Sequence, residues 1–335
     1  MSARRMALVG GGAVLTAALL VEIGLRVALG LGTPPLLQAD STIGYLFQAN
    51  QDLHRFGNRV QINGVHQRSE PLSNRPDSSL LRVLFLGDSV TWGGVLVDQA
   101  DTYPEVFEVR MDSACTLPVE ALNASAGSWG IGNLKAYVER FGTFDSDVVV
   151  LQIGSHDLLQ EASDASPVGE HPAFPTENPW MAIQELVTRY LWPRYVRPLL
   201  TDPQPAPTAT DSTAQAAQFA RNMDALGDLV RTIRAAEARP LLLHTPDRNE
   251  VVGTKDQYAS KYAAYRPRFL ALADSLTVPV VNLKQSWKEV DASAYFRDGV
   301  HLSIRGNEVI GDITVQRVFR YPQSNPCLGS QLIPG

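Results

Sequence analysis

The sequence is poor in cysteine and has no cluster of positive charge, and both features limit what the protein can be. Only two cysteines, Cys115 and Cys327, occur in 335 residues, which excludes a zinc site built from cysteine ligands. Lysine and arginine number 29 against 35 acidic residues, and no basic run occurs. This balance gives no support to nucleic-acid binding, while a hydrophobic fraction of 44% suits a globular protein.

Several common catalytic motifs are also missing. No Gly-x-Ser-x-Gly elbow is present, which argues against the α/β-hydrolase fold, and no phosphate-loop signature occurs. The run Gly10-Gly11-Gly12 resembles a dinucleotide loop but lies within an apolar segment with no strand before it. We therefore predict neither a cofactor nor a bound metal.

The N-terminus carries the longest apolar segment. Residues 6–21 are apolar and would span about 24 Å as a helix, which is short of the roughly 30 Å hydrocarbon core. Apolar residues resume after Glu22, which is spaced to pair with Arg26 on one helix face near the far interface. Arg4 and Arg5 precede the run and place the N-terminus in the cytoplasm.

The alternative to this anchor, over residues 1–32, is a cleavable signal peptide. Ala28-Leu29-Gly30 is only a weak cleavage site, so we favour the uncleaved helix. In both cases the rest of the chain lies outside the cytoplasm, in the periplasm or the extracellular space. An oxidising compartment permits a Cys115–Cys327 disulfide, which would tie the C-terminal tail to the body; two unpaired buried thiols are the alternative.

Composition divides the exported part into an extension, a main domain with an insertion, and a tail. The extension, residues 33–80, is polar and irregular with short possible strands such as 59–62. The main domain, residues 81–320, is followed by a tail at residues 321–335.

Short apolar runs bounded by turn residues recur through the main domain, with room for a helix between them. Uninterrupted hydrophobicity means burial on both faces, which is typical of a parallel sheet covered by helices. The predicted strands are residues 83–86, 119–122, 148–153, 241–243 and 278–281, and the predicted helices 133–141, 214–238, 257–276 and 303–319.

An insertion at residues 160–211 breaks this rhythm. It is rich in proline, including Pro203-Gln204-Pro205-Ala206-Pro207, and holds one helix-like piece near residues 181–190. It is either a lid over the site or an excursion into solvent, and the sequence does not separate the two.

Polar clusters follow four of the predicted strands, where ligands bind in open α/β sheets. They are Gly87-Asp88-Ser89-Val90-Thr91, the segment 123–130, Gly154-Ser155-His156-Asp157, and Asp298-Gly299-Val300-His301. Because these clusters share one edge of the sheet, we predict an active site there.

A serine hydroxyl becomes a nucleophile when a base takes its proton. Among six histidines only His301 closely follows an aspartate, so Asp298 would accept the Nδ1 proton and leave Nε2 facing Ser89. The alternatives are that Ser89 caps the next helix and that His301 only begins one. Asp88 is expected to shape the turn by hydrogen bonds.

An oxyanion formed on acyl attack needs donors. The candidates are the main-chain N–H of Ser89, an N–H of the turn Gly127-Ser128, and the ring N–H of His156, which could instead be structural. Three further residues lie near these clusters in the sequence. Trp92 and Trp129 could stack on a sugar ring or pack in the core, and His244 is expected to support the site rather than act in it.

These motifs resemble the SGNH (GDSL) hydrolase superfamily, whose four blocks occur in order over residues 81–319. Gly87-Asp88-Ser89 matches its nucleophile block and Asp298-x-x-His301 its dyad block. The resemblance implies a three-layer, flavodoxin-like fold and hydrolysis of esters and thioesters of lipids, sugars and small acyl groups. In two places the chain departs from the family. The second block reads Gly127-Ser128, and His156 stands where the family has asparagine.

We therefore expect a membrane-anchored serine esterase outside the cytoplasm, acting on acyl esters such as O-acetyl groups of a cell-surface glycan or lipid. An acyltransferase on the same fold and a non-catalytic glycan-binding scaffold are the alternatives. The expected partners are the acyl-ester substrate and the membrane, through the N-terminal helix.

Overall fold

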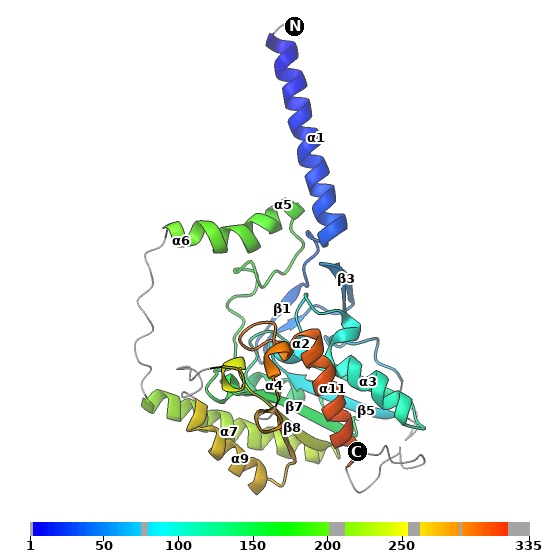
Figure 1. Cartoon of the computed structure of the whole chain (residues 1–335), viewed down its shortest axis with the longest axis vertical. Coiled ribbons are helices and arrows are strands. Elements are labelled where there is room, and N and C mark those ends of the chain that lie inside the picture. The colour runs from blue at the N-terminus through cyan, green and yellow to red at the C-terminus, as the bar shows by residue number, and fades with distance from the viewer. Residues whose placement is uncertain (1–2, 75–79, 201–211, 254–261, 288–289, 321–335) are drawn as a thin grey trace.

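The computed structural model describes residues 3–74, 80–200, 212–253, 262–287 and 290–320. Figure 1 shows a long N-terminal helix that projects from an α/β body. A helical arm runs sideways from the end of this helix that is nearer the body. Two small hairpins lie between the helix and the body (Figure 1).

The body is built on a five-stranded sheet in which every neighbouring pair is parallel. Its strands are β5 (Leu81–Gly87), β6 (Val119–Ser125), β7 (Val148–Gly154), β8 (Arg239–Thr245) and β9 (Val280–Asn282). The order β6-β5-β7-β8-β9 is the doubly wound order of flavodoxin-like folds. All seven residues of β5 and of β7 are buried, as their uninterrupted hydrophobicity predicted. The predicted parallel sheet and fold class are therefore confirmed.

Helices cover both faces of the sheet, which makes three layers. Alternate residues of β5 divide between them: Leu84 and Leu86 pack towards α4 (Ile131–Phe141), α7 (Ser212–Ala235) and α9 (Arg266–Ser275). Val83 and Phe85 pack on the other face, towards α3 (Tyr103–Ala114) and α11 (Ile304–Phe319).

The sequence did not predict α3. Its buried stripe is narrow, with Tyr103, Phe107 and Met111 four residues apart between charged residues. The predicted helix 257–276 lies partly outside the described residues, and α9 occupies most of its described part. The short elements at the strand ends are α2 (Ser89–Trp92), η1 (Gln99–Asp101), η2 (His156–Leu158), η4 (Arg248–Glu250), α10 (Leu283–Ser286) and η5 (Ala292–Tyr295).

The extension at residues 33–80, predicted to be irregular with short strands such as 59–62, contains two antiparallel hairpins. They are β1 (Leu37–Asp40) with β2 (Gly44–Phe47), and β3 (Gln51–Arg55) with β4 (Asn58–Ile62). Residues Phe56 and Gly57 of the second turn both have positive φ, the geometry of tight hairpin turns. Tyr45 and Phe47 are buried in the cluster beneath α4, so the hairpins belong to the core.

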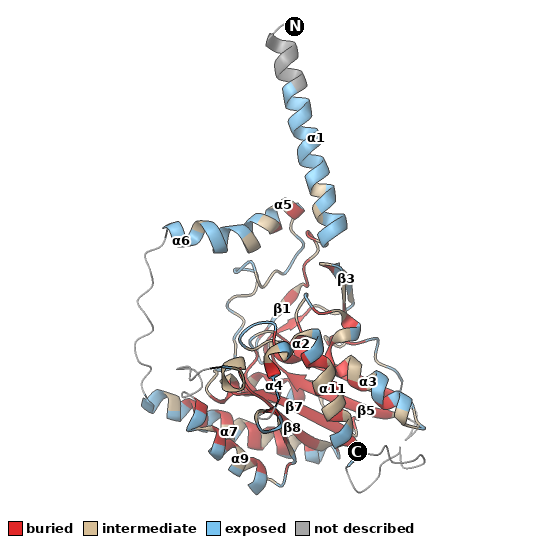
Figure 2. Cartoon of the chain, in the orientation of Figure 1, coloured by how far each residue is buried: buried red, intermediate tan, exposed pale blue. Residues whose placement is uncertain are grey.

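Helix α1 (Ala3–Leu29) leaves the body almost free of contact (Figure 2). Its segment Gly10–Leu29 has a mean hydropathy of 1.9, none of it is buried, and it could cross a membrane by length and composition. A signal sequence passes the same test. Glu22 and Arg26 form the expected i, i+4 ion pair at 2.7 Å.

The insertion contains a continuous helical arm, made of α5 (Ala182–Glu185), η3 (Leu186–Val196) and α6 (Arg197–Leu200). It is longer than the helix-like piece expected at residues 181–190. The proline-rich stretch 203–207 and the tail lie outside the described residues. Cys115 is disulfide-bonded, whereas Cys327, its predicted partner, lies outside the described residues.

Candidate active site

The turn between β5 and α2 presents Ser89 at the carboxyl edge of the sheet. Asp88 caps the helix, because its Oδ1 accepts a 2.7 Å hydrogen bond from the N–H of Val90. Gly87 is needed for close packing, since a Cβ there would collide with Thr91 and lie 2.6 Å from Gln152 Oε1. Gln152 Oε1 also accepts from Thr91 Oγ1 at 3.0 Å, which fixes the turn to β7. Ser89 is therefore held in one position, partly exposed.

His301 approaches Ser89 from the opposite end of the chain, 212 residues away. Its Nε2 lies 3.0 Å from Ser89 Oγ, and its Nδ1 lies 2.8 Å from Asp298 Oδ2. The loop that carries it is closed by a bridge between Phe296 and Leu302 and by the 2.8 Å hydrogen bond from the N–H of Arg297 to the carbonyl of His301. The structure thus brings the three predicted catalytic residues into contact.

Main-chain hydrogen bonds position the Asp298 carboxylate so that it can hold His301 in one orientation. Its Oδ1 accepts hydrogen bonds from the main-chain N–H of Val300 at 3.0 Å and of His301 at 2.9 Å. Partial burial opposes ionisation, but these two donors and the imidazole outweigh it and hold the pKa of Asp298 below its ordinary value. The carboxylate is therefore charged at neutral pH and accepts the Nδ1 proton of His301.

His156 is bound on both ring nitrogens by carboxylates. Its Nε2 lies 2.7 Å from Asp88 Oδ2 and its Nδ1 lies 3.1 Å from Asp247 Oδ1. In this arrangement the ring has no N–H left for an oxyanion, so the geometry does not match the donor role predicted from the sequence. His156 instead joins the nucleophile turn to the loop after β8.

The surrounding carboxylates favour the protonated ring. Burial works against the charge, but Asp157 and the hydrogen bonds to Asp247 and Asp88 outweigh it and hold the pKa of His156 well above its ordinary value. An imidazolium can donate from both nitrogens, as this geometry requires. Burial raises the pKa of Asp157 to about 8, although the charge of His156 opposes that shift.

Within the described part of the chain, the side chains around His156 also form a group that could hold a metal ion. Ligand atoms of Asp88, His156 and Asp157 lie within 4.8 Å of one another. A metal-bound histidine must be neutral, however, and here the ring is engaged by Asp88 and Asp247. These contacts fit an ion-pair network better than a metal centre.

The turn after β6, which contains Gly127 and Ser128, lies at the border of the site. Ser128 is exposed and adopts a φ of +62°, which is uncommon for a residue with a side chain. Its carbonyl accepts hydrogen bonds from Ser163 Oγ and, at 2.8 Å, from Gln160 Nε2. A Cβ added at Gly127 would meet no atom within 4 Å, so the space beside this glycine is open.

The two predicted tryptophans pack rather than face the site. Trp129 is 2% exposed and donates from Nε1 to the carbonyl of Tyr45. Trp92 stacks on Phe47 and lies beneath the guanidinium of Arg68, 4.7 Å from the ring centroid. Core packing, the alternative left open by the sequence, describes both positions.

His244 is fully buried beneath the site. Its Nδ1 donates to the carbonyl of Ile153 at 2.8 Å, and its Nε2 accepts from Arg266 Nε at 3.1 Å. Burial lowers its pKa to about 4, so the ring is neutral. Both of its ring nitrogens are therefore bound within the protein.

Sequence reasoning missed Asp247, Glu250 and Arg266. Arg266 contacts Glu250 and donates to Ser155 Oγ at 2.9 Å, which holds the turn after β7 in place. Asp247 follows β8 by two residues, so the rule that located the other clusters would have found it. Arg266 had no such signal, because it lies on a helix far along the chain.

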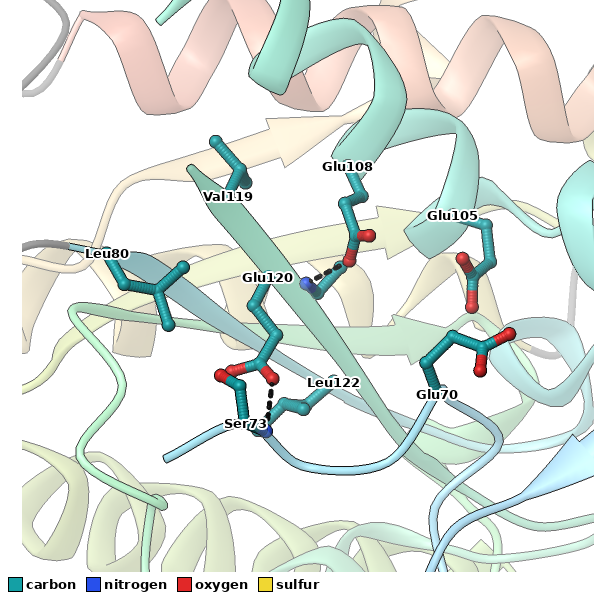
Figure 3. A pocket seen from close by; sticks show the side chains of 9 residues that line it. Glu70, Ser73, Leu80, Glu105, Glu108, Val119, Glu120 and Leu122 are labelled. Carbon is teal, nitrogen blue, oxygen red and sulfur yellow. Dashed lines mark hydrogen bonds between the residues drawn. The ribbon is translucent and has the colours of Figure 1, made fainter. Parts of the chain in front are cut away.

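A cavity of about 230 Å³ lies elsewhere, at the edge strand β6, and is drawn in Figure 3. Four glutamates line it, but Glu108 accepts from the N–H of Ala121 and Glu120 from that of Ser73 (Figure 3). None of Ser89, Asp298 and His301 lines this cavity. It is therefore separate from the candidate active site.

The sequence model of the GDSL-like lipase/acylhydrolase family matches residues 85–309, and the chain belongs to this family. It is accordingly an ester-cleaving hydrolase of the GDSL type, as predicted. No curated protein matches the sequence.

Several solved structures are similar to the chain over most of their own length. The acetyl xylan esterase AlAXEase is 17% identical with a TM-score of 0.47, and 71% of this chain covers 100% of that one. TesA is 15% identical with a TM-score of 0.44, over 71% of this chain and 98% of its own. A catalytic mutant of Axe2, an acetylxylan esterase from Geobacillus stearothermophilus, is 16% identical with a TM-score of 0.45, over 70% and 93%.

Proposed function

We propose that the protein is a membrane-anchored serine esterase outside the cytoplasm, with Ser89 as nucleophile, His301 as general base and Asp298 as the residue that orients His301. The observation that carries this proposal is the 3.0 Å contact between Ser89 Oγ and His301 Nε2 in a chain of the GDSL family. The substrates are acyl esters, O-acetyl groups among them, of a cell-surface glycan or a lipid.

The contacts support the following order of proton transfers. His301 Nε2 takes the proton of Ser89 Oγ as that oxygen attacks the acyl carbonyl carbon, and Asp298 stabilises the imidazolium. His301 then gives the proton to the leaving alcohol oxygen. A water molecule attacks the acyl-enzyme by the same route, which releases the acid and restores Ser89.

The developing oxyanion needs donors that are free in the resting site. The N–H of Ser89 belongs to the first turn of α2, where main-chain N–H groups have no partner within the helix. The open space beside Gly127 lets a substrate oxygen approach the turn at Gly127-Ser128. We assign the oxyanion hole to these main-chain groups, and give His156 the role of holding the Asp88 turn.

Labelling with a fluorophosphonate probe tests the assignment of Ser89. The full-length protein in detergent is expected to react covalently, and both Ser89→Ala and His301→Ala to abolish the reaction. Ser113→Ala is the matched control, because Ser113 is an exposed serine on α3. Absence of labelling in the folded wild-type protein would remove the catalytic proposal and favour a binding scaffold.

Product analysis separates hydrolysis from transfer. With an acylated donor and a glycan acceptor present, the esterase releases free acid. Acylated glycan as the main product would assign the same residues to an acyltransferase.

A further inference from the structure

We infer that the helical arm, residues 182–200, lies flat in the interface of the bilayer that α1 crosses and forms a second membrane contact. This inference rests on the proposed anchoring by α1 and not on the chemistry of Ser89. Its partner is the phospholipid surface on the side of the membrane where the catalytic domain lies.

Beyond its first turn, where Ala182 and Glu185 are buried, the arm contacts the body mainly through Tyr190, which lies against Phe56 and Arg55. None of residues 186–200 is buried, and most of the segment lies away from the body in Figure 2. It nevertheless carries large apolar side chains, which cost free energy in water. Those at least 40% exposed are Val187, Leu191, Trp192, Tyr195, Leu199 and Leu200.

These side chains share one side of the helix. Residues 186–196 form a π-helix, with hydrogen bonds between residues five apart, so side chains four and five apart lie on the same side. Val187, Leu191, Tyr195 and Leu199 follow one another at intervals of four, and Trp192, Val196 and Leu200 come five residues after Val187, Leu191 and Tyr195. Arg189 and Arg197 stand in a different row, with Pro193 between them. An apolar side with aromatic residues beside an arginine row is the composition of helices that lie in the membrane interface.

The arm also begins at the depth where α1 would leave the hydrocarbon. The apolar run of α1 before Glu22, residues 6–21, spans about 24 Å as a helix, so Glu22 lies near the boundary of the roughly 30 Å hydrocarbon core. Glu22 accepts hydrogen bonds from the N–H of Ala182 at 2.7 Å and of Ile183 at 3.0 Å. The first turn of the arm is therefore fixed to α1 at the interface.

Two further contacts hold this junction. Arg26 Nη2 donates to the carbonyl of Trp180 at 3.1 Å, and Trp180 is 88% exposed beside α1. Glu185 forms a buried ion pair with Arg55 of β3 and accepts from the N–H of Gly32 at 2.6 Å. From this junction the arm runs crosswise to α1 (Figure 1), so an upright α1 places the arm along the membrane plane.

A second contact would restrict how the catalytic domain turns about α1. A single helix leaves rotation about its axis free, whereas an arm in the interface fixes which side of the body faces the lipid. In Figure 1 the α2 end of the body is turned towards α1, and α9 lies at the opposite end. Helix α2, which begins with Ser89, is thereby kept on the side of the body that faces α1.

Tryptophan quenching in vesicles tests the inference. The chain has five tryptophans, and Trp92, Trp129 and Trp287 are buried, so Trp180→Phe leaves Trp192 as the exposed emitter. Full-length Trp180→Phe protein is placed in phosphatidylcholine and phosphatidylglycerol vesicles whose acyl chains carry bromine. We expect Trp192 to lose emission to the brominated chains and to be protected from aqueous iodide.

Substitutions on the apolar side of the helical arm provide the second part of the test. Leu191→Asp with Leu199→Asp is expected to abolish quenching by brominated lipid and to restore quenching by iodide. Val109→Asp is the matched control, since Val109 is 63% exposed on α3, far from the arm, and should leave quenching unchanged. Hydrolysis of a soluble ester in detergent should be equal in all these variants, which keeps this test independent of the esterase proposal.

Two results would overturn the inference. Quenching of Trp192 by iodide and not by brominated lipid places the arm in water. Protection from both quenchers means that protein covers the arm, either a second copy or another partner.

Discussion

Asp88 and His156 form a 2.7 Å ion pair between the nucleophile turn and the turn after β7. The other oxygen of Asp88 caps α2, so a single carboxylate connects the backbone that carries Ser89 to a protonated imidazole. His156 stands where the third sequence block of the family has asparagine. Its ring contacts two carboxylates, those of Asp88 and Asp247, and an asparagine side chain is too short to contact both.

His156→Asn is expected to destabilise the protein in a pH-dependent way. The folded pKa of His156 lies above its unfolded value of about 6.5, so its stabilisation is complete below that pH and is lost as pH rises through the raised pKa. Thermal unfolding from pH 6 upwards should show the variant less stable by about 1–3 kcal/mol at the acidic end. If the stability of wild type and of His156→Asn changed with pH in the same way, a charged His156 would be contradicted.

Gly154→Ala is expected to displace His156. A Cβ at this position would lie 2.6 Å from His156 Cε1 and 2.9 Å from Nδ1, closer than packed atoms allow. We expect a stability loss of about 1–3 kcal/mol, measured by denaturant unfolding. Gly127→Ala is the control for stability, because its Cβ would meet nothing within 4 Å.

Asp298→Asn tests the orientation of His301. An amide can donate towards Nδ1 and so favour the wrong tautomer, and kcat should fall by about 10³–10⁴-fold with little change in KM. Asp291→Asn is a matched control, since Asp291 also accepts from the main chain, at Ser293, within the same loop region. Equal activity of Asp298→Asn and wild type would remove Asp298 from the mechanism.

His244→Gln is expected to reduce sensitivity to acid. The buried ring has a pKa of about 4, below the unfolded value of about 6.5, so the unfolded state binds the extra proton between these values. Wild-type stability should therefore fall by about 3 kcal/mol as pH drops from about 6.5 to about 4, and the variant should lack that part of the decline. An unchanged decline would show that other groups cause it.

The Arg55–Glu185 pair is expected to be strongly coupled. Both side chains are almost fully buried, 0% and 4% exposed, so Glu185→Ala leaves an unpaired buried guanidinium and should cost about 3–5 kcal/mol. Adding Arg55→Ala should cost little more, because the charge is then gone as well. The exposed pair of Asp52 and Arg59 serves as control, and Asp52→Ala should cost less than about 1 kcal/mol.

Local signals were sufficient for the sheet and for the three residues now in contact at its edge. β5 and β7 contain the apolar runs 83–86 and 148–151, which favour burial on both faces, and parallel strands bring their carboxyl ends together. Ser89 was predictable because it comes directly after β5 and begins α2, and His301 because it follows Asp298 by three residues shortly before α11. The direction of the His156 ring was not, because it depends on Asp247, 91 residues away.

The sequence by itself determined the class of fold, the apolar N-terminal helix and the residue types at the sheet edge, since these follow from hydrophobic period and short spacing. Only the tertiary structure decided that Trp92 and Trp129 pack inward, that His156 bridges two carboxylates, and that the arm at residues 182–200 meets α1 at Glu22. The physical reason is that a hydrogen bond or an ion pair needs both partners in position. Residues between 68 and 160 positions apart, as these are, acquire that position only when the chain is folded.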